Sequence, residues 1–193
     1  MSKNLDTRWL AVIAGALIAA AGINVLLGPA GFLTLGMATG IAAILRGLLL
    51  VITSDRIRQV PQMRGSTLFS SVLGLMLIVF GIFVFFNPGL EAQTLAYFVA
   101  GWFLLDTVQI ILATRWLFRQ NLGVWIYHFI IYEMLFVLGL LILVLARPNL
   151  VSLIGIGFLV LSGASVIRGV WARRIEEKYQ ITGPFWQRPF MNM

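Results

Sequence analysis

Hydrophobic residues occur along this chain in long runs that short polar breaks separate. We place six such runs at about these positions: 9–27, 31–53, 66–87, 91–113, 124–146 and 149–172. A helix of about twenty residues, rising 1.5 Å per residue, crosses the roughly 30 Å hydrocarbon core of a bilayer. The pattern therefore predicts an all-α integral membrane protein with six transmembrane helices.

The first, third and fifth polar breaks are short, and each contains a proline: Pro29, Pro88 and Pro148, which lie 59 and 60 residues apart. Proline fits a helix boundary because its nitrogen cannot donate a helical hydrogen bond. The spacing predicts three tandem αα-hairpin repeats, at about 9–53, 66–113 and 124–172. We expect residues 1–172 to form a single six-helix membrane domain and residues 173–193 to form a cytoplasmic juxtamembrane tail, which first extends the last helix.

The charge pattern predicts the orientation of these helices. Only 11% of the residues are charged, against about 25% in a soluble domain. Of the hairpin tips, only one carries a basic residue, Arg147. The ends of the chain and the connections between hairpins carry eleven basic residues: Lys3, Arg8, Arg56, Arg58, Arg64, Arg115, Arg119, Arg173, Arg174, Lys178 and Arg188. The positive-inside rule then predicts that both termini are cytoplasmic.

The net charge of +7 has the same origin. It fits contact with anionic lipid headgroups at the cytoplasmic face better than nucleic-acid binding, which requires a basic surface on a soluble element. The chain has no cysteine and one histidine, His128, so disulfides and thiolate metal sites are excluded and any other metal site is disfavoured. No nucleophile and base occur at a recognisable spacing, so we expect neither an enzyme nor a cofactor.

Glycines recur at fixed distances before the loop prolines. Gly15 and Gly22 lie 14 and 7 residues before the first proline, and Gly74 and Gly81 lie at the same distances before the second. A spacing of seven places two glycines on one helix face, where small residues let helix backbones approach closely. We predict packing of this kind for the first three spans and expect Gly163 and Gly169 to pack similarly in the sixth. The packing glycines are Gly15, Gly22, Gly36, Gly40, Gly74 and Gly81. A glycine-lined substrate path is the alternative.

This arrangement of glycine, second glycine and loop proline, followed by a second helix of small residues, resembles the HdeD-like acid-resistance membrane proteins. The second repeat carries the resemblance best, from Gly74 through Gly81 to Pro88 and then Phe98-Val-Ala-Gly-Trp102. The likeness extends from about residue 9 to residue 172. It implies a six-span bacterial inner-membrane protein linked to acid or envelope stress, and it supplies no catalytic motif.

Four charged residues fall inside the predicted spans: Arg46, Asp106, Glu133 and Arg168. A charged side chain at the centre of a transmembrane helix costs about 2.5–3.5 kcal/mol on insertion scales. We expect the first, second and fourth to lie one to two turns from the cytoplasmic ends of their helices, where an arginine can also extend to the headgroups. We predict that one of the arginines pairs with Asp106 or Glu133 in the interior, although Asp106 could instead line a polar pocket with Gln109.

Glu133 lies near mid-membrane, where burial penalises the charged form of a carboxyl group. Such a group suits a proton sensor or relay, and a structural, protonated or arginine-paired role is the alternative. The sequence thus favours a non-catalytic stress protein and leaves a small proton-linked transporter or channel as its alternative. It also leaves open whether the protein binds a second copy of itself or another membrane protein.

Overall fold

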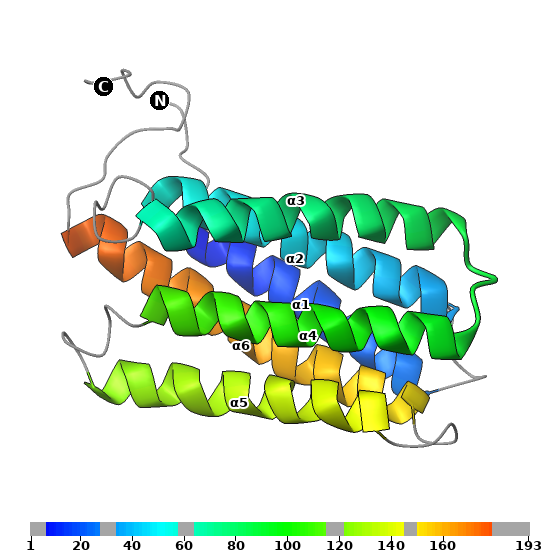
Figure 1. Ribbon diagram of the computed structural model, residues 1–193. Helices are drawn as coiled ribbons and strands as arrows, with labels where there is room; N and C mark the ends of the chain where they lie inside the picture. The colour runs from blue at the N-terminus through cyan, green and yellow to red at the C-terminus, as the bar shows by residue number, and fades with distance from the viewer. Residues whose placement is uncertain (1–6, 28–33, 58–63, 115–121, 145–149, 179–193) are drawn as a thin grey trace.

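The structure, a computed structural model, describes residues 7–27, 34–57, 64–114, 122–144 and 150–178. This part of the chain contains no strand and forms six helices: α1 (Thr7–Leu26), α2 (Leu35–Ile57), α3 (Arg64–Phe86), α4 (Ala92–Thr114), α5 (Leu122–Val144) and α6 (Leu150–Lys178). The helices lie side by side and alternate in direction, so α1 begins and α6 ends at the same end of the bundle (Figure 1).

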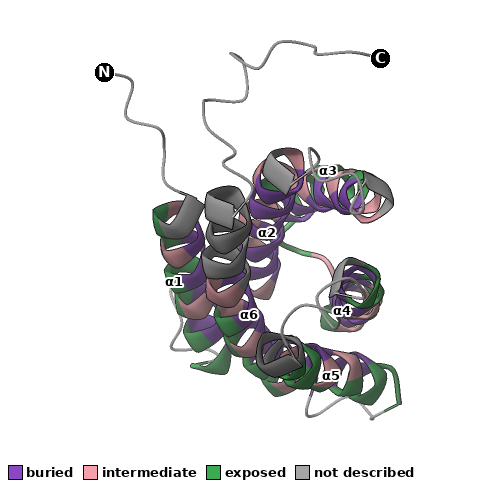
Figure 2. Ribbon diagram, turned by 90° about the vertical axis from the view of Figure 1, so that its left-hand side faces the viewer, coloured by how far each residue is buried: buried purple, intermediate pink, exposed green. Residues whose placement is uncertain are grey.

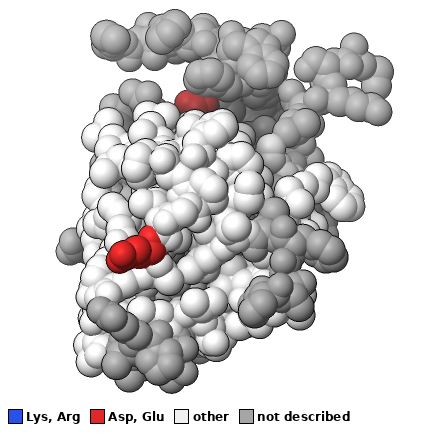
Figure 3. Space-filling view, turned by 90° about the vertical axis from the view of Figure 1, so that its right-hand side faces the viewer, with Lys and Arg blue, Asp and Glu red and all other residues white. Residues whose placement is uncertain are grey.

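Five of the helices, α1, α2, α3, α4 and α6, are long and apolar enough to cross a membrane. In α5 the apolar stretch found within the described residues is Phe129–Val144. The described surface at the end of the bundle that includes the α3–α4 connection is almost free of charge (Figure 3). The chain is therefore an all-helical, multi-pass membrane protein.

The ends of the helices differ from the predicted spans for local reasons. The second span was predicted to begin at residue 31, but α2 begins at Leu35. Thr34 explains this start, because its Oγ1 accepts a hydrogen bond of 3.2 Å from the backbone N–H of Met37, as an N-cap residue does. At the other end of the chain α6 continues past residue 172 to Lys178. The tail predicted at 173–193 therefore begins as helix.

The connection between α3 and α4 shows how a loop proline ends a hairpin's first helix. Asn87 closes α3 twice: its backbone N–H donates to the carbonyl of Val84 at 3.1 Å, and its Nδ2 donates to the carbonyl of Phe83 at 2.7 Å. These bonds provide donors for carbonyls that lack a partner at a helix end. Pro88 follows in the turn, before α4 begins at Ala92. The other two loop prolines lie outside the described residues.

The most extensive helix contacts join neighbouring hairpins: α1 packs on α6, α2 on α3, and α4 on α5. Contacts between the two helices of one hairpin are less extensive in all three cases. The second helices of the hairpins, α2, α4 and α6, also contact one another, so they form the inside of the bundle. Figure 2 shows the helices end-on, with buried residues on their inward sides.

Glycines bring the backbones of α2 and α3 into direct contact. A Cβ atom added to Gly47 would lie 2.5 Å from the carbonyl oxygen of Gly74, and one added to Gly40 would lie 2.8 Å from that of Gly81. Both distances are shorter than van der Waals contact, so a larger residue would force the helices apart. This seam consists of two reciprocal glycine pairs, seven residues apart on each helix.

The α1–α6 seam is built in the same way, with Gly22 against the backbone of Gly155 and Gly15 against Val166. The remaining glycines differ from this pattern. A Cβ on Gly36 would meet Pro88 in the α3–α4 turn rather than a helix. The expectation for Gly163 was wrong, because a Cβ there would have no atom within 4 Å. The surroundings of Gly169 lie outside what the structure describes.

Candidate functional site

A buried ion pair joins α2 and α4, two of the three helices at the inside of the bundle. Arg46 lies 11 residues from each end of α2, or about 16 Å at the rise of an α-helix. Its Nε and Nη2 donate to the two carboxylate oxygens of Asp106 on α4, at 2.9 Å each. Both side chains are 0% exposed. This fork-to-fork geometry is the strongest arrangement that an arginine and a carboxylate can adopt.

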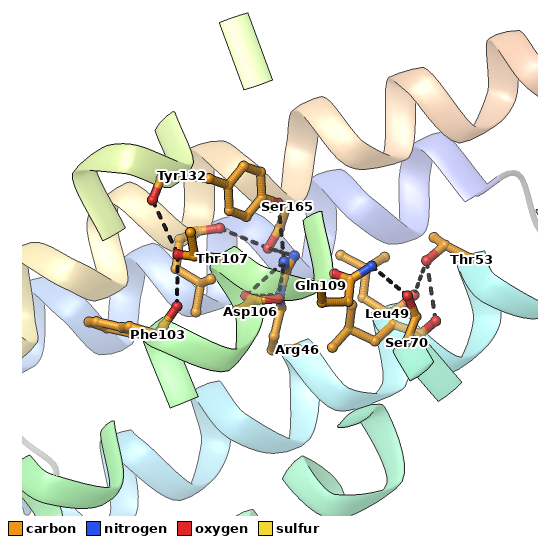
Figure 4. A network of polar contacts seen from close by, with 12 residues as sticks. Arg46, Leu49, Thr53, Ser70, Phe103, Asp106, Thr107, Gln109, Tyr132 and Ser165 are labelled. Atoms are coloured by element: carbon orange, nitrogen blue, oxygen red, sulfur yellow. Dashed lines mark hydrogen bonds and ion pairs between the residues drawn. The ribbon is translucent and has the colours of Figure 1, made fainter. Parts of the chain in front are cut away.

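Two more helices bind the same guanidinium group. Arg46 Nη1 donates to Ser165 Oγ on α6 at 3.1 Å, and Nη2 donates to the phenol oxygen of Tyr132 on α5 at 3.2 Å. Figure 4 shows Tyr132, Ser165 and Asp106 around Arg46, with the hydrogen bonds between them as dashed lines. One cation therefore holds α2, α4, α5 and α6 together, and it uses four of the five directions in which a guanidinium can donate.

Further polar contacts extend from this cluster along α4. Thr107 Oγ1 donates to the carbonyl of Phe103 at 2.9 Å and to that of Tyr132 at 3.2 Å, so it ties α4 to α5. Gln109 Nε2 donates to Ser70 Oγ and ties α4 to α3. The polar side chains of Thr107, Gln109 and Ser70 are all buried. The name central polar cluster is used below for these residues: Arg46, Asp106, Tyr132, Ser165, Thr107, Gln109 and Ser70.

An aromatic cluster packs beside the central polar cluster. The rings of Trp102 and Phe158 lie 5.9 Å apart, and those of Phe103 and Phe158 lie 6.3 Å apart. The Phe103 ring rests against Gly157, where no side chain could be accommodated without movement. These apolar groups exclude lipid and water from the seam between α4 and α6, which strengthens the electrostatic attraction within the ion pair.

Not every buried polar atom has a partner. The hydroxyl groups of Thr39 and Ser54 on α2 and the indole nitrogen of Trp102 on α4 are buried without a hydrogen bond. An unpaired polar group in a low-dielectric interior is destabilising. Arg46 differs from these unpaired groups because it donates four hydrogen bonds, so the ion pair is the well-organised part of the interior.

The structure separates the four charged residues that the sequence grouped together. Arg46 and Asp106 form the predicted type of ion pair, so Asp106 pairs with an arginine rather than lining a pocket with Gln109. The expected depth of Arg46 was wrong: it lies about three turns from the end of α2, in the middle of the helix. Glu133 lies apart, on α5, and makes no ion pair with a described residue. Arg168 belongs to α6, but its side chain lies outside the described residues.

Sequence reasoning missed Tyr132 and Ser165 as partners of Arg46. A signal for Ser165 is present in the sequence: Arg46, Asp106 and Ser165 lie 17, 18 and 17 residues after their loop prolines. Corresponding positions of the three second helices therefore meet in the interior. Tyr132 has no such signal, because a tyrosine near mid-span also fits an apolar core.

Within the described part of the chain, no three His, Cys, Asp or Glu residues lie together as metal ligands would. The geometry therefore defines a membrane bundle with one buried, internally bonded ion pair. No protein-family model matches the chain, and no curated protein and no solved structure is similar to it at a significant level.

Proposed function

We propose that this chain is a non-catalytic protein of the bacterial inner membrane that acts in resistance to acid or envelope stress. The HdeD-like pattern of glycines and loop prolines supports the stress role and the location. The observation that carries the non-catalytic part is the bonding of the Arg46–Asp106 pair, in which the carboxylate binds the guanidinium group and the guanidinium group also binds side chains of α5 and α6. Groups bonded in this way hold helices together.

The proposed architecture is a threefold repeat of hairpins with both termini in the cytoplasm. Equivalent offsets of Arg46, Asp106 and Ser165 from the loop prolines support the repeat. The contacts between neighbouring hairpins, which follow the same scheme at all three seams, support it as well. The cytoplasmic orientation rests on the basic residues of the connections between hairpins and of the chain ends.

The alternative function is a small proton-linked transporter that uses the charges in its interior. The two functions make opposite demands on the Arg46–Asp106 pair. A structural pair can be replaced by apolar side chains of similar size, because the packing is kept and no charge stays unpaired. A pair that binds or moves protons cannot be replaced in this way.

The test is survival of an acid challenge in a strain that lacks the gene, complemented with the wild-type chain or with the double variant Arg46→Met/Asp106→Leu. We expect both to restore survival to the same level when their abundance in the membrane is equal. If the wild-type chain does not change survival, the stress role is wrong. If the wild-type chain restores survival and an equally abundant, folded double variant does not, the transporter is favoured over the non-catalytic role.

A further inference from the structure

The outward face of α5 carries a carboxyl group without a partner in the described part of the chain. Glu133 lies 11 residues from each end of α5, and its half-buried side chain makes no hydrogen bond or ion pair with a described residue. Ile130 and Val137, about one turn before and after it, are 53% and 49% exposed. The carboxyl group therefore lies on the side of α5 that faces away from the bundle, at the depth where an ionisable group is most costly in lipid.

The third hairpin differs from the other two at this position. The first helices of hairpins one and two place Gly15 and Gly74 14 residues before the loop proline, and both glycines touch a neighbouring helix. In α5, Glu133 and Met134 occupy the corresponding region. Among the described glycines of α4 and α5, Gly139 approaches the other helix most closely, and a Cβ added to it would lie 3.3 Å from the carbonyl oxygen of Ala100. At the two other seams, a Cβ added to a glycine would lie less than 3 Å from an atom of the neighbouring helix. The helix α5 therefore packs less closely in its own bundle.

We propose that this face of α5 is a self-association surface, on which a second copy of the chain packs so that the two Glu133 carboxyl groups bond each other. A twofold axis places the same residue of each copy opposite itself. A carboxylic acid is self-complementary, because a protonated carboxyl donates its O–H to an oxygen of the other carboxyl. The pairing removes the unpartnered group from lipid, and it goes beyond the proposed stress role without depending on it.

The apolar residues around Glu133 fit the same partner. Ile130, Met134, Val137 and Leu141 are exposed on α5, and their spacing of four, three and four residues is that of a left-handed helix pair. A partner for this face must be apolar apart from one hydrogen-bonding group at mid-membrane. A second α5 has that composition at that depth by symmetry, whereas a foreign helix would need a hydrogen-bonding side chain at the same depth.

Cysteine cross-linking tests the contact directly, because the natural chain has no cysteine. Val137→Cys places one thiol on the proposed surface. Val79→Cys is its matched control: Val79 has the same position in α3 as Val137 has in α5, 15 residues after the first residue of the helix, and it is 69% exposed. In native membranes under mild oxidation, we expect a covalent homodimer from Val137→Cys and none from Val79→Cys.

Glu133→Leu in the Val137→Cys chain then tests the carboxyl group. The substitution lies on an outward face, so the bundle should fold as before, and we expect dimer formation to weaken about tenfold, as for the loss of an interhelical hydrogen bond. A monomer with no cross-link at Val137→Cys overturns the proposal, as does equal cross-linking at both cysteines. A cross-link from Val137→Cys to a different protein would overturn the proposal, because a foreign protein and not a second copy would then cover this face. Unchanged dimerisation after Glu133→Leu removes Glu133 from the interface.

Discussion

The buried ion pair makes a quantitative prediction about stability that a double-mutant cycle can test. Asp106→Leu removes the carboxylate that binds Arg46, and it leaves a guanidinium in the interior that cannot lose its charge. Removing one partner of a buried pair costs about 3–5 kcal/mol, and we expect Asp106→Leu to lie at the upper end. Arg46→Met should lie at the lower end, because an isolated carboxyl can lose its charge by binding a proton.

The double variant Arg46→Met/Asp106→Leu should recover most of this loss. No charge stays behind, and the remaining cost is that of the hydrogen bonds to Tyr132 and Ser165, about 0.5–1.5 kcal/mol each. The double variant is therefore expected to be more stable than either single variant. Additive losses would refute the reasoning, because they would mean that the two charges do not interact.

The measurement is unfolding of the purified chain by SDS in mixed micelles, followed by the fluorescence of its six tryptophans. The four chains of the cycle are compared at one protein and detergent concentration. Residues in contact generally show coupling energies of about 0.5–3 kcal/mol, and we expect at least the upper value here because the pair is bidentate and fully buried.

Two further predictions concern packing and unpaired polar groups. Gly81→Ala should lower the free energy of unfolding by about 1–3 kcal/mol, because the new methyl group meets the α2 backbone at 2.7 Å. Gly101→Ala should raise the free energy of unfolding by up to about 1 kcal/mol, because alanine favours a helix more than glycine does and the new methyl group has no atom within 4 Å. Thr39→Val should raise it by about 1 kcal/mol because it removes an unpaired buried hydroxyl. Thr107→Val should lower it by about 0.5–1.5 kcal/mol, since that hydroxyl donates to two carbonyls. The same SDS titration measures all four, and a reversed order within either pair would contradict the contacts.

The helices and the type of ion pair could be predicted from the sequence because both follow from local rules. Hydrophobic run length gives the spans, and the cost of a charge in lipid requires a partner for Arg46. The identity of that partner depends on how helices 60 residues apart are rotated and shifted against each other, which no local pattern specifies. Asp106, rather than Glu133, is the partner because α4 lies inside the bundle and Glu133 points out of it.

The glycines illustrate the same limit. Their distances from the loop prolines predicted which faces of α1 and α3 would be small, and the structure places a neighbouring helix against those faces. The offsets do not say which helix that neighbour is. Gly163 shows the consequence, because a small residue on a helix gives close packing only where another backbone approaches, and none approaches there.

The separation of Arg46 from its partners along the chain has a consequence for biosynthesis. Asp106 follows Arg46 by 60 residues, Tyr132 by 86 and Ser165 by 119. At about 5–20 residues per second, a ribosome reaches Asp106 some 3–12 seconds after Arg46. During that interval α2 carries a cation whose carboxylate partner has not yet been made, which is costly in lipid. We therefore expect the release of α2 from the insertion machinery into lipid to follow the synthesis of α4.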